Sequence, residues 1–212
     1  MQSNRNKFET MDHKRFRQTR SLIADYYNGC KVGYVGPEGY RKSTDLVKFS
    51  RCIDELLLQG YIDPQLTIFL DLGCADGRVN VLMSYFVRQS IGIESDADIL
   101  AESNQRSRHL ALRLQRENLV LPPDNIALFH GNSLEAATYD GILNSTGVHF
   151  AQVDLFYTYI TLHDLFAEKI ATEAKTGALY LVYGFNKILP RYQGLELLIS
   201  DVAAQGLVAL YQ

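Results

Sequence analysis

From residue 64 onward, short apolar runs alternate with longer segments of helical periodicity, and this pattern constrains the fold more than any other feature. The runs that predict strands are 67–72, 90–94, 126–130, 148–157, 178–184 and 207–211. The segments that predict helices are 78–88, 97–118, 161–174 and 194–204. Strands that alternate with helices form βαβ units, whose right-handed crossovers place helices on both faces of the sheet. We therefore predict an α/β fold with a doubly wound, mostly parallel sheet.

The first 63 residues lack this alternation. Residues 1–12 resemble a polar tail, and residues 14–27 and 43–59 carry the apolar stripes of helices. Residues 28–41 contain four glycines and one proline, which predict a loop. We expect a helical arm and lid loop over residues 1–63 and a ligand-binding core over residues 64–212.

Charge and composition narrow the class of protein. The net charge is −3, but residues 1–60 carry +4 and residues 61–212 carry −7. A mildly basic front end can contact an anionic partner, yet no aromatic and basic residues interleave, so there is no strong nucleic-acid signal. The three cysteines show no CxxC spacing, which predicts free thiols and no metal site. No apolar run reaches the roughly 18–20 residues of a membrane helix, so we expect a cytoplasmic protein without a membrane segment.

The segment 68–96 carries the most informative motif. A predicted strand ends at Asp71, and a small-residue turn, Gly73-x-Ala75-x-Gly77, leads directly into a helix. Such a turn lets a ligand approach the backbone at the carboxyl ends of the strands. The dinucleotide fingerprint GxGxxG is not met, because Arg78 stands where its third glycine belongs.

Two acidic residues indicate the kind of ligand. Asp71 is unfavourable beside a pyrophosphate but suits an ammonium group. Glu94 lies 23 residues further on, at the end of the next predicted strand, where an acid can accept hydrogen bonds from ribose hydroxyls. The pattern therefore predicts a nucleoside ligand with a cationic tail, a description that S-adenosylmethionine fits.

The sequence DLGCADGR at residues 71–78, followed by IGIESD at residues 91–96, resembles motif I and the next acidic motif of the class I, seven-stranded S-adenosylmethionine-dependent methyltransferases. The resemblance extends over about residues 67–184. It implies a Rossmann-like doubly wound sheet and methyl transfer from S-adenosylmethionine.

The resemblance also implies a set of cofactor-binding residues. Asp71 would hold the methionine amino group, Glu94 the ribose, and Ser95 one side of the purine. Asn132 stands where the family often has an acid near the adenine, with Ser133 as the alternative. The residues that would line the methionine and the adenosine are Gly73, Cys74, Ala75 and Gly77.

The fourth predicted strand should end beside the transferred methyl group. Its sequence has no NPPY or DPPY tetrapeptide, no cysteine and no metal-binding acid cluster. It offers Asp154 to accept a hydrogen bond from an amine, and Tyr157 and Tyr159 to line an apolar channel that lowers the pKa of that amine. We therefore expect Asp154 and Tyr157 to be catalytic. We also expect the acceptor to be a protein side chain, a lysine-like amine. A small-molecule acceptor under a lid at residues 28–41 is the alternative, as is a non-catalytic cofactor-binding or scaffold protein.

A looser resemblance, to the seven-stranded protein-lysine methyltransferases, supports a protein acceptor. In those enzymes the loop before the first core helix reaches over the methionine end of the cofactor, a place that Tyr40, Ser43 and Thr44 occupy here. The sequence ends at Gln212, just after one predicted strand. The seventh strand is therefore expected to come from the arm or from a partner, or to be missing, and an unpaired edge would favour a homodimer.

Overall fold

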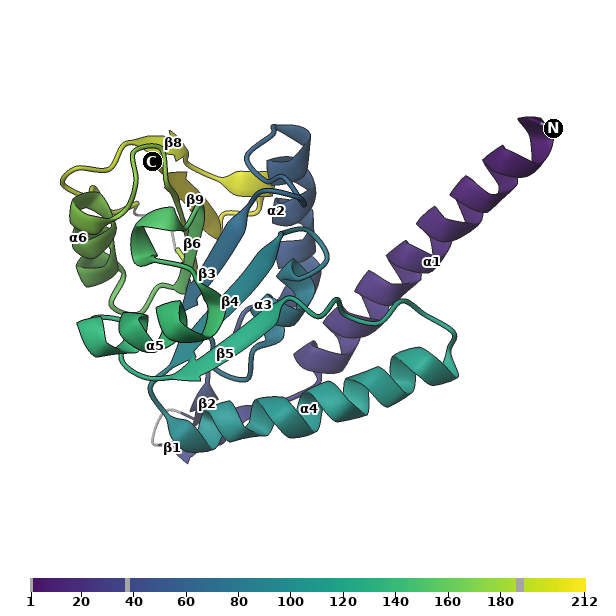
Figure 1. Cartoon of the computed structure of the whole chain (residues 1–212), viewed down its shortest axis with the longest axis horizontal. Coiled ribbons are helices and arrows are strands. Elements are labelled where there is room, and N and C mark those ends of the chain that lie inside the picture. The colour runs from purple at the N-terminus through teal and green to yellow at the C-terminus, as the bar shows by residue number, and fades with distance from the viewer. Residues whose placement is uncertain (1, 37–38, 186–188) are drawn as a thin grey trace.

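Seven strands form one sheet in the order β5-β4-β3-β6-β7-β9-β8, as the computed structural model shows (Figure 1). The structure describes residues 2–36, 39–185 and 189–212, and the side chains of residues 13–33, 42–185 and 189–212. The five neighbouring strands β5, β4, β3, β6 and β7 run parallel to one another. Strand β9 is antiparallel to both of its neighbours, β7 and β8. This arrangement confirms the predicted doubly wound, mostly parallel sheet. The strands are β3 (Ile68–Leu72), β4 (Gln89–Glu94), β5 (Ile126–His130), β6 (Leu155–Tyr159), β7 (Leu179–Tyr183), β8 (Leu197–Ile199) and β9 (Val208–Tyr211).

Helices cover both faces of this sheet, each over its own hydrophobic core. The core on one face joins the sheet to α1 (Gln2–Asn28), α2 (Leu46–Leu58), α3 (Arg78–Met83) and α4 (Ala97–Arg116). The core on the other face joins it to α5 (Ala136–Thr146) and α6 (His163–Glu173). The N-terminal half of α1 extends away from the rest of the molecule (Figure 1).

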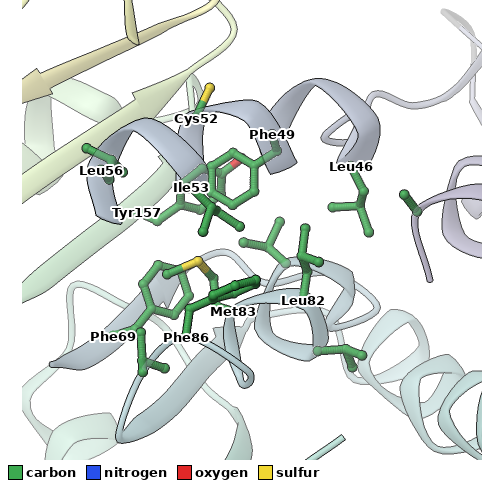
Figure 2. Packing of buried hydrophobic residues seen from close by; sticks show 14 of the residues in the cluster. Leu46, Phe49, Cys52, Ile53, Leu56, Phe69, Leu82, Met83, Phe86 and Tyr157 are labelled. Carbon is green, nitrogen blue, oxygen red and sulfur yellow. The ribbon is translucent and has the colours of Figure 1, made fainter. Parts of the chain in front are cut away.

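Helix α2 ties the front end of the chain to the sheet. Its side chains Phe49 and Ile53 are fully buried and pack toward Phe69 of β3 and Tyr157 of β6 (Figure 2). Burial of each such apolar side chain contributes about 1.5–3 kcal/mol. Asp45 caps the helix, because its carboxylate accepts hydrogen bonds from the backbone N–H groups of residues 47 and 48. This packing holds the residues just before α2 against the carboxyl ends of β3 and β6.

The end of the chain differs from the sequence prediction. The helix predicted over residues 194–204 is wrong, because this segment holds β8 and the short 3₁₀ helix η2 (Val202–Ala204). Leu195 and Leu198 have the spacing of a helical face, whereas the short edge strand buries little and so leaves a weak alternating pattern. The seventh strand thus belongs to this chain, and the argument for a homodimer from a missing strand no longer holds.

Four other segments differ from expectation. The predicted polar tail is part of α1, and the sequence did not predict α5. The predicted loop at 28–41 contains a two-stranded sheet of β1 (Val32–Gly36) and β2 (Gly39–Arg41). The predicted strand 148–157 begins only at Leu155, after the 3₁₀ helix η1 (Phe150–Gln152). Among the helices of the described residues, none is both long and apolar enough to cross a membrane.

Candidate functional site

The turn between β3 and α3 is built from unusual backbone angles. Gly73 has a φ of +123°, which favours glycine, and a side chain there would enter open space. Gly77 has a φ of +74°, and a Cβ atom on it would lie only 2.7 Å from a methyl group of Leu128. Ala75 also has a positive φ, at 49°. The turn therefore presents bare backbone at Gly73 and packs tightly against β5 at Gly77.

Glu94 closes this turn from the neighbouring strand. It lies at the carboxyl end of β4 and is 3% exposed. One carboxylate oxygen accepts a hydrogen bond from the Ala75 N–H (2.9 Å), and the other accepts one from the Asp96 N–H (3.0 Å). These two hydrogen bonds hold the Glu94 carboxylate in place beside the exposed backbone of Gly73.

Asp71 is the most unusual carboxylate of the site. It is 1% exposed at the carboxyl end of β3, and its Oδ1 atom has no hydrogen-bond partner among the described residues. Burial raises the pKa of Asp71 well above its usual value, and the nearby Glu94 and Asp76 raise it further. A buried carboxylate with an unsatisfied oxygen is a site for a cation such as an ammonium group.

Two adjoining cavities lie at this edge of the sheet. The larger, of about 290 Å³, is close in size to the roughly 300 Å³ at which small-molecule sites begin. Its lining is Lys42, Leu72, Gly73, Ala75, Ile93, Glu94, Ser95, Gly131, Asn132, Ser133, Thr158, Tyr159, Thr161, Leu162 and Phe166. The smaller, of about 40 Å³, is lined by Lys42, Ser43, Thr44, Asp71, Gly73, Cys74, Ala75, Arg78, Val79, Tyr157 and Tyr159. The two cavities share Lys42, Gly73, Ala75 and Tyr159, so one ligand can extend from Glu94 to Asp71.

The arm contributes to the smaller cavity through Thr44. This residue is 4% exposed, and its hydroxyl shares a hydrogen bond of 2.5 Å with the hydroxyl of Tyr157. Burial raises the pKa of Tyr157 well above its usual value, and the negative charge of Asp71 raises it further. Tyr157 is therefore a neutral phenol at physiological pH. The side chain of Tyr40, the other arm residue predicted at the site, lies outside the described residues.

Most of the predicted cofactor residues come together here. Gly73, Ala75, Asp71, Cys74 and Thr44 line the smaller cavity, and Glu94, Ser95, Asn132 and Ser133 line the larger one. Two of the predicted cofactor residues, Gly77 and Asn132, make contacts that stabilise the protein's own fold. Gly77 is the N-cap residue of α3 and packs on Leu128. The Asn132 side-chain amide accepts a hydrogen bond from the Leu134 N–H and donates one to the Glu135 carboxylate.

The catalytic role predicted for Asp154 is wrong. This residue precedes β6, so it lies at the amino end of the strand and at the opposite edge of the sheet from Glu94. Its carboxylate accepts a hydrogen bond from the Ile68 N–H (2.7 Å) and forms an ion pair with Lys175. Asp154 therefore stabilises the start of β3. The error is one of register, because the apolar run did not indicate where the strand begins.

Three residues of the cavity lining, Thr158, Thr161 and Lys42, were not predicted from the sequence. Thr158 and Thr161 follow Tyr157 at the carboxyl end of β6, where a correctly placed strand would have predicted them. Lys42 lines both cavities from the arm, and its side chain is exposed. No motif marks Lys42 in the sequence, because only the packing of α2 on the sheet brings it to the site.

Comparisons with known proteins agree with this fold. No protein-family profile matches the sequence, and no curated protein does. An RNA methyltransferase from Salinibacter ruber in complex with S-adenosyl-L-homocysteine has a TM-score of 0.51 and 14% identity, covering 80% of this chain and 92% of its own. The tRNA (m1A58) methyltransferase TrmI from Aquifex aeolicus has a TM-score of 0.50 and 10% identity, covering 91% of this chain and 74% of its own. The chain thus has the class I, seven-stranded methyltransferase fold, which confirms the resemblance of residues 71–78 and 91–96 at the level of fold.

Proposed function

We propose that this chain is an S-adenosylmethionine-dependent methyltransferase. The observation that carries the proposal is the pair of buried acids in two adjoining cavities, with Glu94 in the larger one and Asp71 in the smaller one. Asp71 offers an unsatisfied carboxylate oxygen, and Glu94 is anchored by backbone N–H groups beside the bare backbone of Gly73. An ammonium at one end and ribose hydroxyls at the other match this arrangement.

Each part of the site then has a role in binding. Asp71 accepts hydrogen bonds from the methionine ammonium and neutralises its charge, and Glu94 accepts hydrogen bonds from the ribose. Ser95 and Ser133 flank the purine in the larger cavity. When bound, S-adenosylmethionine supplies an electrophilic methyl group on a sulfonium. Catalysis by this chain consists mainly of orienting the two reactants and excluding water, because in-line displacement depends on position.

We propose a lysine-like amine of a protein as the acceptor. Tyr159 lines both cavities, and its ring lies 5.4 Å from the ring of Tyr183. Desolvation of an amine beside the Tyr159 ring would disfavour its charged form and so lower its pKa, which frees the lone pair for attack. Asp154 has no role in this proposal, because it lies at the other edge of the sheet.

RNA is a second candidate acceptor, and Lys42 favours it. Its exposed ammonium lines both cavities, where it can pair with a phosphate of the nucleic-acid backbone. The basic front end, with a charge of +4 over residues 1–60, adds to this attraction. The two structural neighbours described above are RNA-modifying enzymes by their names.

A labelling experiment tests both proposals. The protein is incubated with methyl-labelled S-adenosylmethionine and a total cell extract, which is then fractionated into protein, RNA and small molecules. Label in protein, at lysine after hydrolysis, supports the first acceptor, and label in RNA supports the second. If the folded protein gives neither heat nor a thermal shift with S-adenosylmethionine or S-adenosylhomocysteine, the proposed function is wrong.

A further inference from the structure

A cluster of three charged side chains, Asp76, Arg78 and Arg106, lies at the turn between β3 and α3. Asp76 is fully buried and accepts hydrogen bonds from Arg78 at Nε (2.8 Å) and Nη2 (2.9 Å). Arg106 of α4 forms a second ion pair with the same carboxylate. Arg78 is itself only 3% exposed. A buried carboxylate between two guanidinium groups is compensated in charge, which is why the cluster is tolerated.

The same Arg78 reaches two points of the arm. Its Nη1 donates to the Ser43 hydroxyl (2.8 Å), and its Nη2 donates to the carbonyl oxygen of Cys30 (3.2 Å). Its guanidinium also lies 5.7 Å from the centre of the Tyr27 ring. One guanidinium thus bonds the turn at Asp76 and both ends of the segment between α1 and α2.

This contact bears on one half of the ligand site. Ser43 and its neighbour Thr44 line the smaller cavity together with Asp71, and Arg78 directly follows Gly77 of the turn. The larger cavity shares Lys42, Gly73 and Ala75 with the smaller one, but most of its lining comes from residues 93–95, 131–133 and 158–166. These three segments lie outside the Arg78 hydrogen bonds to Asp76, Ser43 and Cys30. Loss of the Arg78 contacts should therefore weaken binding of the methionine part of the ligand in the smaller cavity. Binding of the adenosine part in the larger cavity should not change.

We propose that Arg78 is a positioning residue that fastens the N-terminal arm over the methionine end of the cofactor site. Arg78 thereby increases the affinity of the site for ligands that carry the amino-acid part, such as S-adenosylhomocysteine, and not for adenosine, which lacks it. This inference rests on the proposed function for the identity of the ligand. Arginine suits the task because its planar fork serves several acceptors at once, whereas a lysine ammonium is a single point charge.

Arg78→Lys is the informative variant, because it keeps a positive charge beside Asp76 while removing the fork. Binding of S-adenosylhomocysteine and of adenosine is measured by calorimetry, and amide exchange of residues 28–46 is measured without ligand. We expect the Kd for S-adenosylhomocysteine to rise about tenfold, which corresponds to about 1.4 kcal/mol. We expect the Kd for adenosine to stay within about twofold on the same scale, and amide exchange in residues 28–46 to accelerate.

Arg116→Lys is the matched control, because Arg116 is exposed near the end of α4 and should change none of these values. Ser43→Ala removes one Arg78 contact without touching the buried pair, so it provides the test if Arg78→Lys does not fold. It should give the same selective loss to a smaller extent. The proposal is overturned if both ligands weaken equally or if amide exchange in the arm is unchanged. Failure of the parent protein to bind either ligand would contradict the proposed function instead, and the exchange measurement would still decide the role of Arg78.

Discussion

Asp71 of β3 and Tyr157 of β6 are register partners on neighbouring parallel strands, and both side chains are buried. The Tyr157 hydroxyl in turn shares a hydrogen bond with Thr44 of the arm. The smaller cavity therefore joins a carboxylate of the motif I turn, a phenol of the fourth parallel strand and a hydroxyl from the front end of the chain. This convergence suggests how each group can be tested.

Asp71→Asn should stabilise the ligand-free protein at neutral pH. The folded-state pKa of Asp71 lies above its unfolded value of about 3.9, so its share of stability is complete below that value and is lost as pH rises through the folded pKa. Each unit by which the folded-state pKa of Asp71 exceeds its unfolded value lowers the free energy of unfolding by about 1.4 kcal/mol at a pH above both values. Urea unfolding from about pH 4 to about pH 8 should therefore show a difference in the free energy of unfolding that favours the variant and widens with pH.

The same variant should bind S-adenosylhomocysteine at least about tenfold more weakly, because a charge-assisted hydrogen bond to the ammonium is worth about 1.5–3 kcal/mol. Asp124→Asn, at an exposed loop position, is the control and should change neither property. An identical pH dependence of stability in parent and Asp71→Asn protein would contradict the assigned electrostatics.

Glu94→Gln should weaken adenosine and S-adenosylhomocysteine by the same factor, since both ligands carry the ribose. The expected loss is about 1.5–3 kcal/mol for a charged acceptor. Calorimetry with the two ligands measures it, and the exposed Glu168→Gln serves as control. Unchanged affinity for adenosine would show that Glu94 only supports the Ala75 turn.

Tyr157→Phe should lower affinity for S-adenosylhomocysteine several-fold, by the same factor at pH 6 and pH 9. The pKa of Tyr157 is raised well above its usual value of about 10, so the phenol does not titrate over this range. The free energy of unfolding of the variant should be lower by about 0.5–1.5 kcal/mol, because the hydrogen bond to Thr44 is lost. Tyr85→Phe removes a comparable bond, to the Val120 carbonyl, and should affect stability alone. A pH-dependent ratio between parent and variant would disprove the neutral phenol.

Asp154→Ala should reduce stability and leave ligand binding intact. It removes the acceptor of the Ile68 N–H and the partner of Lys175, and the partial exposure of this pair limits the loss to about 1 kcal/mol. Urea unfolding and calorimetry with S-adenosylhomocysteine measure the two effects. A clear loss of binding without loss of stability would restore Asp154 to the site.

The motif I turn could be predicted from the sequence because its determinants are local. A buried strand, the glycines at 73 and 77 and a helix start specify the backbone path, and the positive φ angles require small residues there. Asp71 and Glu94 follow from the same logic, since carboxyl ends of parallel strands share one edge of the sheet. The sequence alone therefore determined the fold class and the two acids that define the candidate ligand.

The tertiary structure decided what depends on register and on contacts between distant segments. The apolar run 148–157 does not show that β6 begins at Leu155, so it could not place Asp154 at the amino end. The contact of Arg78 with Ser43 joins residues 35 positions apart, and that of Thr44 with Tyr157 joins residues 113 positions apart. Periodicity predicts which face of an element is buried, but only packing determines which segment covers that face.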